Sequence, residues 1–214
     1  MFRQYRPIER NEFFVIFADT SAGLGDYCAV QFLSKTHLDI PLVYHSKSIA
    51  TEMTNAIHPV IEKIHDYTGV KPVVAYERNN GGLFELERLA ALNRLGKYSI
   101  FEMPNSGRVD NPEPTKIGWD TNTATRPKML QDFKDAIDNK LLHIYDKPTV
   151  TELYSFVLVQ TTSTIKAQAE RGAHDDLVMS GAGAWQLQIM CNPPQIISNT
   201  DLPQFKARDS VIGI

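Results

Sequence analysis

The chain has 214 residues, of which 43% are hydrophobic and 22% are charged, with a formal net charge of −3. This composition supplies a substantial hydrophobic core, and the negative balance excludes a protein that coats nucleic acid by bulk electrostatics, although a local basic groove remains compatible with it. No apolar run approaches the roughly 18 to 20 residues that span a bilayer, and the N-terminal MFRQYRPIER lacks an apolar signal segment. We therefore expect a soluble, intracellular protein with no membrane partner.

The N-terminal part of the chain predicts three strands followed by a helix. Residues 12–18 and 27–33 have the apolar, β-type composition of strands joined by the glycine-rich turn TSAGLGD, and 42–45 is a third strand. Apolar residues recur at helical spacing over 48–67, and Gly69 stands where such a helix would end. These elements predict a strand meander next to a helix.

The middle of the chain alternates strand and helix patterns. A short strand is expected over 72–77, a helix over 83–92 and a further strand over 97–103. Proline, glycine and asparagine accumulate over 104–125, which indicates loops, and helical periodicity returns over 126–139. Strands that alternate with helices indicate βαβ units.

The C-terminal part is less regular. A weak apolar segment covers 142–145, residues 150–159 could be helix or strand, and 161–167 has an extended pattern. The last strong element is a helix that begins near His174. We expect one α/β domain over 1–192, with a mixed β-sheet flanked by helices, and a C-terminal tail over 193–214. The two cysteines, Cys28 and Cys191, have no C-x-x-C partner and give no support for a disulfide framework or a zinc cluster.

Acidic residues stand at the ends of several predicted elements. Asp19 closes the apolar strand in FFVIFADTSAGLGDYCAV, Glu77 closes the fourth strand, and Asp175 and Asp176 open the last helix. If the first and fourth strands are neighbours, their carboxylates meet at one sheet edge, and like charges gathered there are unfavourable unless cations neutralise them. Hard oxygen ligands suit Mg²⁺ or Mn²⁺, and two such ions about 4 Å apart can cleave a phosphodiester. The pattern favours a metal-dependent nuclease.

Each of these residues also has a simpler explanation. An aspartate before glycine, such as Asp19, is usually a turn or capping residue, and Glu77 could belong to a polar loop. HDD at a helix start is most often an N-cap pair. The conjunction of all three features at compatible positions is what points to catalysis.

Four ordered motifs resemble a known family. DTSAGLGDYCA, VVAYERNNGG, GWDTNTATRPKML and GAHDDLVMSGAGA together resemble the nuclease domain of the large terminase subunit, the DNA-packaging motor protein of tailed bacteriophages. The resemblance covers roughly residues 12–190. It implies the RNase H-like (retroviral integrase-like) fold and a two-metal endonuclease that cuts concatemeric viral double-stranded DNA.

The resemblance also implies roles for individual acids. Asp19 matches the first-strand metal ligand and Glu77 the fourth-strand ligand. The third ligand falls in HDD, where adjacent helical residues point about 100° apart, so Asp175 and Asp176 are both candidates. Asp26 looks like an accessory acid that could hold a water at the metal, or it could cap a turn.

Several polar residues near these motifs are candidates for DNA contact. Arg78 and Asn79 follow Glu77 directly, where they could order that ligand or contact DNA. Arg126 and Lys128 lie near a helix start, where cations and backbone N–H groups can hold phosphates. Their alternative role is that of ordinary solvated residues. His174 could orient a water or the scissile phosphate, although capping the helix is the commoner role.

The sequence departs from a complete large terminase in one respect. No P-loop is present, since Gly96-Lys97 is followed by Tyr98. We therefore expect an isolated nuclease domain without ATP hydrolysis. The resemblance implies the host cell cytoplasm as location and the terminase ATPase domain, the small terminase subunit and the portal protein as partners. The alternatives are another RNase H-like nuclease, such as a Holliday-junction resolvase or RNase H, and a non-catalytic DNA-binding or assembly module.

Overall fold

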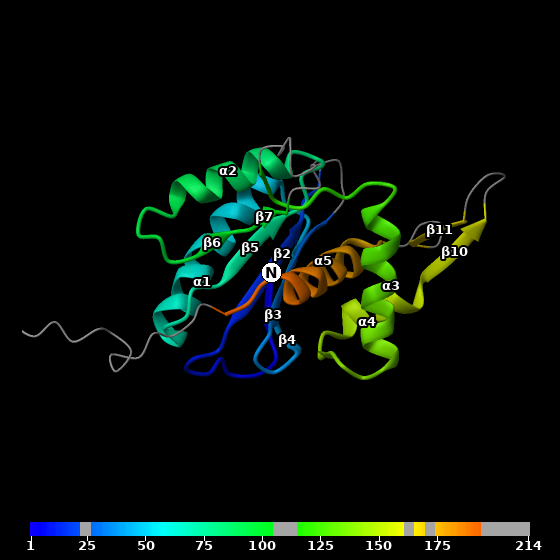
Figure 1. The fold of residues 1–214 in the computed structure, drawn as a ribbon, viewed down its shortest axis with the longest axis horizontal. Helices are drawn as coiled ribbons and strands as arrows, with labels where there is room; N and C mark the ends of the chain where they lie inside the picture. Colours follow the sequence, from blue (N-terminus) through cyan, green and yellow to red (C-terminus); the bar gives the residue numbers. More distant parts are fainter. Residues whose placement is uncertain (22–26, 105–114, 161–164, 170–173, 194–214) are drawn as a thin grey trace, which may run out of the picture.

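A central mixed sheet organises the molecule (Figure 1). The computed structural model describes residues 1–21, 27–104, 115–160, 165–169 and 174–193. The sheet has the strand order β1-β4-β3-β2-β5-β6, with β9 paired to β4. Its strands are β1 Phe2–Gln4, β2 Phe14–Asp19, β3 Cys28–Ser34, β4 Asp39–Ser46, β5 Val73–Tyr76, β6 Ser99–Ile100 and β9 His143–Ile144.

Strand β2 lies in the middle of this sheet and combines two kinds of pairing. It is antiparallel to β3, so the two form the expected hairpin, and parallel to β5, which is reached through the crossover helix α1 (Ala50–Thr68). A parallel pair brings the carboxyl ends of both strands to one edge. The first and fourth strands predicted from the sequence are therefore neighbours, and their acidic ends meet.

Helices cover both faces of the sheet. In Figure 1, α1 and α2 lie on one side, and α5 and α3 lie on the other. Two short hairpins, β7–β8 and β10–β11, complete the described chain, and β10–β11 projects beyond α3 and α4. The remaining bounds are α2 Gly82–Leu92, α3 Thr125–Asp138, α4 Lys147–Tyr154, α5 Asp176–Met190, β7 Glu102–Met103, β8 Lys116–Ile117, β10 Phe156–Gln160 and β11 Ile165–Ala169.

The alternation of side chains along β2 divides the core in two. Val15 and Phe17 belong to the cluster that includes α3 and α5, while Phe14 and Ile16 belong to the cluster that includes α1 and α2. Successive residues of a strand point to opposite faces, so an all-apolar strand is what a sheet covered on both sides requires. The continuous apolar run in the sequence thus reflects burial on two faces.

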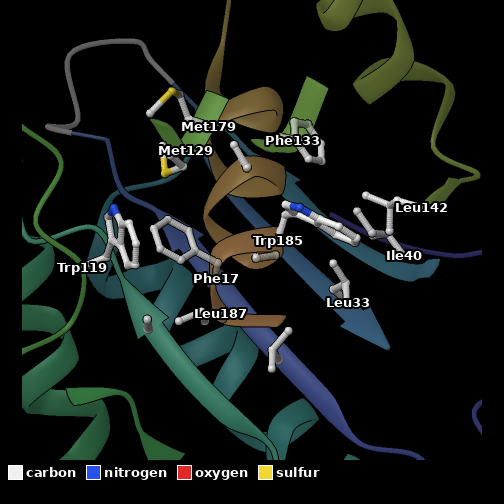
Figure 2. Close-up of a cluster of buried hydrophobic side chains, with 14 of the residues drawn as sticks. Phe17, Leu33, Ile40, Trp119, Met129, Phe133, Leu142, Met179, Trp185 and Leu187 are labelled. Atoms are coloured by element: carbon white, nitrogen blue, oxygen red, sulfur yellow. The ribbon is translucent and has the colours of Figure 1, made fainter. Parts of the chain in front are cut away.

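Helix α5 is packed deeply against the sheet (Figure 2). All residues from Leu177 to Leu187 are buried. A Cβ added to Gly183 would lie 2.4 Å from Cε1 of Phe17, so the backbone of α5 approaches β2 more closely than any side chain would permit. Gly183 therefore sets the distance between α5 and β2.

The predicted element order is confirmed, and the differences are local. Strand β1 was not predicted, the 97–103 segment divides into β6 and β7, and 150–159 contains both the end of α4 and most of β10. Residues 161–164 and the tail from 194 onward lie outside the described residues, so the domain boundary remains a prediction. Within the part of the chain that the structure describes, every helix is too short or too polar to span a bilayer.

Candidate metal centre

Asp19 and Glu77 stand side by side at the edge of the sheet. Ala18 pairs with Tyr76, and the Glu77 backbone N–H donates to the Ala18 carbonyl at 2.9 Å. Phe17 and Ala75 belong to the core cluster beneath α5. Because side chains two residues apart along a strand point to the same face, Asp19 and Glu77 lie on that face too. The strand register therefore directs both carboxyl groups toward α5.

The beginning of α5 brings two further carboxylates to this edge. Asp175 occupies the N-cap position and Asp176 is the first helical residue. The pKa of Asp19 is raised well above its ordinary value, first by burial and then by the charges of Glu77 and Asp176, a hydrogen bond with Glu77 and the charge of Asp175. Four of the five acids named from the sequence therefore form one electrostatic group.

The chemistry of this group fits a hard divalent cation. Buried carboxylates that repel one another must share protons or be neutralised, and carboxylate oxygens are the donors that Mg²⁺ and Mn²⁺ prefer. The side chains as they stand do not form a finished ligand set, since the described residues contain no group of three or more His, Cys, Asp or Glu that could hold a metal ion. The donor types and the electrostatics thus suit a metal, while the side-chain positions fall short of a complete coordination shell.

The loop after β5 holds Glu77 in place. Asn79 donates from Nδ2 to Oε1 of Glu77 at 3.0 Å and to the Thr121 carbonyl at 3.2 Å. A Cβ on Gly82, the first residue of α2, would lie 1.8 Å from the Glu77 carbonyl oxygen, so only glycine allows this approach. Asn79, considered for DNA contact, orients the candidate ligand, and Arg78 donates to the Ile117 carbonyl at 2.8 Å.

Of the two basic residues of α3 that were named from the sequence, one lies at the site. Arg126 Nη2 is 3.2 Å from Asp175 Oδ2, and Arg126 Nη1 is 3.1 Å from the sulfur of Met179. The Asn122 side chain positions this helix start by accepting from the N–H groups that follow it. Lys128 instead pairs with Asp132 one turn along α3, and its side chain is exposed. The structure brings Arg126 to the acids and leaves Lys128 on the surface.

His174 lies at the outer rim of the site. Its Nδ1 is 3.7 Å from Asp176 Oδ2, and its ring meets the Tyr27 ring edge-on at 5.1 Å. Tyr27 in turn stacks on His45 at 4.3 Å, and the Lys47 ammonium lies 5.0 Å from the Tyr27 ring. His174 is exposed, next to a cationic and aromatic surface.

Glu152 is a residue of this region that the sequence did not reveal. From α4 it accepts the backbone N–H of Leu177 at 2.8 Å and of Val178 at 3.3 Å, in the first turn of α5. Burial is the main cause that raises the Glu152 pKa, to about 7. The two hydrogen bonds oppose this shift, and the negative charges of Asp176 and Asp175 add to it. The capping role considered for His174 and the aspartates is thus performed by Glu152. A glutamate 25 positions before its partner carries no local signal.

Asp26 falls within 22–26, outside the described residues. Its two predicted roles, as an accessory acid or as a turn cap, therefore stay predictions. Cys28 and Cys191 are both free thiols, as expected.

Comparison with known proteins identifies the fold. No protein-family model and no curated protein matches the chain. Among solved structures, the large terminase nuclease from the thermophilic phage G20c with bound magnesium is 19% identical, with a TM-score of 0.59 over 86% of this chain and 84% of that one. The chain has the fold of a terminase nuclease domain.

Two further structures support this conclusion. The large terminase nuclease domain of Thermus phage P74-26 is 19% identical, with a TM-score of 0.57 over 86% of this chain and 83% of that one. A manganese-soaked nuclease domain of the human cytomegalovirus terminase is 13% identical, with a TM-score of 0.54 over 83% and 84%. The RNase H-like mixed sheet expected from the motifs is therefore confirmed across a phage and a herpesvirus comparison.

Proposed function

We propose that this chain is a divalent-metal-dependent endonuclease that cuts concatemeric viral double-stranded DNA during genome packaging. The observation that carries the proposal is the meeting of Asp19, Glu77 and the start of α5 at one edge of the sheet, with the pKa of Asp19 raised by burial and by the charges of the other acids. The fold supports it, because the similar G20c and cytomegalovirus domains are nucleases with bound magnesium and soaked manganese.

In this proposal, Asp19, Glu77 and at least one of Asp175 and Asp176 hold two Mg²⁺ or Mn²⁺ ions. Such ions would supply a strong nucleophile at neutral pH and would neutralise charge on the attacking and leaving oxygens of the phosphodiester. Asn79 keeps the Glu77 carboxylate in one orientation, and the Arg126 guanidinium offsets part of the negative charge on Asp175.

The substrate approaches from the exposed rim. Lys47 and His174 flank Tyr27 next to the acids, and cations with an aromatic ring suit contact with a nucleic-acid backbone and its bases. Arg78 and Lys128 add positive charge on neighbouring elements. By the same reasoning from the fold, the ATPase domain, the small terminase subunit and the portal protein are the proposed partners, and the host cytoplasm is the proposed location.

Plasmid digestion tests the proposal. Wild-type chain should nick and linearise plasmid DNA with Mg²⁺ or Mn²⁺, and Asp19→Asn and Glu77→Gln should each reduce the rate at least about 100-fold because they remove anionic ligands while preserving shape. Asp138→Asn, on the exposed end of α3, serves as control and should cut normally.

Three results would contradict the assignment. Full cleavage by both Asp19→Asn and Glu77→Gln would remove these residues from the chemistry. Preference for four-way junctions or RNA–DNA hybrids over duplex DNA would instead indicate a resolvase or an RNase H, and metal-independent DNA binding without cleavage would indicate a binding module.

A further inference from the structure

The first turn of α5 is capped from another helix. The opening N–H groups of a helix lack partners within the helix, and an aspartate at the N-cap position normally supplies one by folding its side chain back. Among the described residues, Asp175 makes no such cap bond, and the N–H groups of Leu177 and Val178 point to Glu152 instead. A carboxylate next to the positive end of the helix dipole also stabilises it.

The helix that carries Glu152 is itself firmly anchored. Asp146 caps α4 by accepting from the Thr149 backbone N–H at 2.9 Å and from its hydroxyl at 2.7 Å. Arg3 binds the same carboxylate through two nitrogens, at 2.6 and 3.0 Å. The Gln31 amide of β3 bridges α4 and α5, donating to the Thr149 hydroxyl and the Leu177 carbonyl. Glu152 therefore acts from a fixed platform.

We propose that Glu152 is a positioning residue of the metal centre: it caps α5 from outside, so that Asp175 and Asp176 are directed to the cation site. A self-capping Asp175 would direct its oxygens to its own helix and would be lost as a ligand. With the cap supplied by Glu152, the Asp175 carboxylate instead faces Arg126 at the site. This inference rests on the proposed function, in which Asp175 and Asp176 bind a metal ion.

A matched set of conservative substitutions tests it. Glu152→Asp shortens the side chain by one methylene and keeps its charge, so the bonds to Leu177 and Val178 should break. Glu152→Gln keeps the length and an acceptor oxygen. Glu12→Asp is the control, since Glu12 is also buried and also accepts a backbone N–H, that of Glu9 at 2.7 Å, but stands before the opposite end of β2.

The measurements separate positioning from general stability. In metal-free protein, Glu152→Asp should shift the amide NMR signals of Leu177 and Val178 and speed their hydrogen exchange about tenfold, whereas Glu12→Asp should leave both unchanged. The same Glu152→Asp protein should need about tenfold more Mn²⁺ for half-saturation, measured by water-proton relaxation, because supporting groups set ligand geometry. Glu152→Gln should remain within about threefold of wild type in Mn²⁺ affinity.

Each outcome decides the matter. Unchanged amides in Glu152→Asp, or changed amides with Mn²⁺ affinity within twofold of wild type, would overturn the positioning role, as would an equal loss of affinity in Glu12→Asp. A wild-type chain that binds Mn²⁺ but does not cut DNA would overturn the proposed function and leave the Glu152 comparison intact. A wild-type chain that binds no Mn²⁺ would overturn both.

Discussion

Asp19 occupies a position where a carboxylate works against folding. It ends a strand whose preceding residues are buried, and its neighbours Glu77, Asp175 and Asp176 repel its charge. Local rules that favour stability are broken mainly where function requires it. In the proposed function, the acid at the end of β2 is a cost to folding that the binding of a metal ion offsets.

Asp19→Asn should stabilise the metal-free protein while it removes cleavage. The raised pKa means that the folded state resists ionisation of Asp19. The wild type therefore loses stability as pH rises above the ordinary carboxyl range, whereas the Asp19→Asn variant, which has no carboxyl group there, does not. We expect a gain of about 1 kcal/mol in unfolding free energy at pH 8, by urea denaturation, that diminishes toward pH 4. A variant less stable than wild type at pH 8 would contradict this.

His45 gives a second pH-dependent prediction. Burial is the main cause that lowers the His45 pKa, to about 4; the charge of Arg3 lowers it further, and the charge of Asp146 opposes the shift. The His45 Nε2 atom is buried and has no hydrogen-bond partner among the described residues. The unfolded chain therefore binds a proton near pH 6.5 that the folded chain refuses until about pH 4. Stability from this residue is present above pH 6.5 and disappears as pH falls.

His45→Phe should remove that dependence and can still stack on Tyr27. Between pH 7 and pH 4, the wild type should lose about 1–2 kcal/mol more unfolding free energy than His45→Phe, after allowance for solvent screening. Urea denaturation at both pH values measures it. A difference that does not vary with pH would show that His45 titrates normally.

Some residues of the candidate site could be predicted from the sequence and others could not, for physical reasons. Asp19 and Glu77 were predictable because strand ends are visible in the apolar pattern and parallel neighbours align their ends. Glu152 was not, since its role depends on how α4 packs against α5, and no local pattern encodes that packing. Arg126 was named for DNA contact, while its ion pair with Asp175 emerges only in the folded chain.

At the level of elements, α5 determines the geometry of the site. It is buried along most of its length and contacts β2 through Gly183 and α3 through Gly181, where an added Cβ would lie 2.8 Å from Phe133. Close-packed interiors transmit small displacements, so any outward movement of α5 would carry Asp175 and Asp176 away from Asp19.

Gly183→Ala tests this coupling. The new methyl would collide with the Phe17 ring at 2.4 Å, and the resulting strain of about 1–3 kcal/mol should exceed the roughly 1 kcal/mol that alanine gains over glycine in a helix. We expect lower unfolding free energy and slower DNA cleavage.

The double variant Phe17→Leu with Gly183→Ala serves as the control for that contact. It should lose less stability than the sum of the two single changes, with a coupling of about 1 kcal/mol in a double-mutant cycle. Strict additivity would mean that the two residues do not collide.

Elements of different length were predictable to different degrees. The long helices and β2 to β5 follow from periodicity, because many residues contribute to each pattern. Strands β1 and β9 contain three and two residues and exist through pairing with β4, which local sequence does not specify. The 150–159 segment was ambiguous for a similar reason, since a short helix passes directly into a hairpin strand there.

Across the whole molecule, Asp146 connects the N-terminal segment to α4. Arg3 and Tyr5 reach it from the N-terminal segment, and Thr149 reaches it from α4. Burial would raise its pKa, but these hydrogen bonds prevail and lower it, so the residue remains charged. A buried carboxylate with this many partners holds β1, α4 and, through Gln31, α5 in one unit.

Asp146→Ala should therefore destabilise the entire chain. The substitution leaves the Arg3 guanidinium without its carboxylate partner and removes the cap of α4. We expect the unfolding free energy to fall by about 3 kcal/mol. Urea denaturation followed by circular dichroism measures it. The exposed Asp138→Ala variant should leave the denaturation midpoint unchanged, and a similarly small effect at Asp146 would contradict the argument.

The position of α5 in the chain also sets the order in which the molecule can assemble. Strands β2, β3 and β4 are adjacent in sequence and close short loops, whereas the bond from Gln31 to the Leu177 carbonyl closes 146 positions. Contacts so distant along a polypeptide form late, because closing the long loop costs conformational entropy before the contacts contribute any stabilisation. The acidic edge is complete only after α5 docks, so a chain in which α5 has not yet packed holds Asp19 and Glu77 together but lacks Asp175 and Asp176 beside them. In the proposed function, the chain would therefore become competent to cut DNA only once α5 has docked.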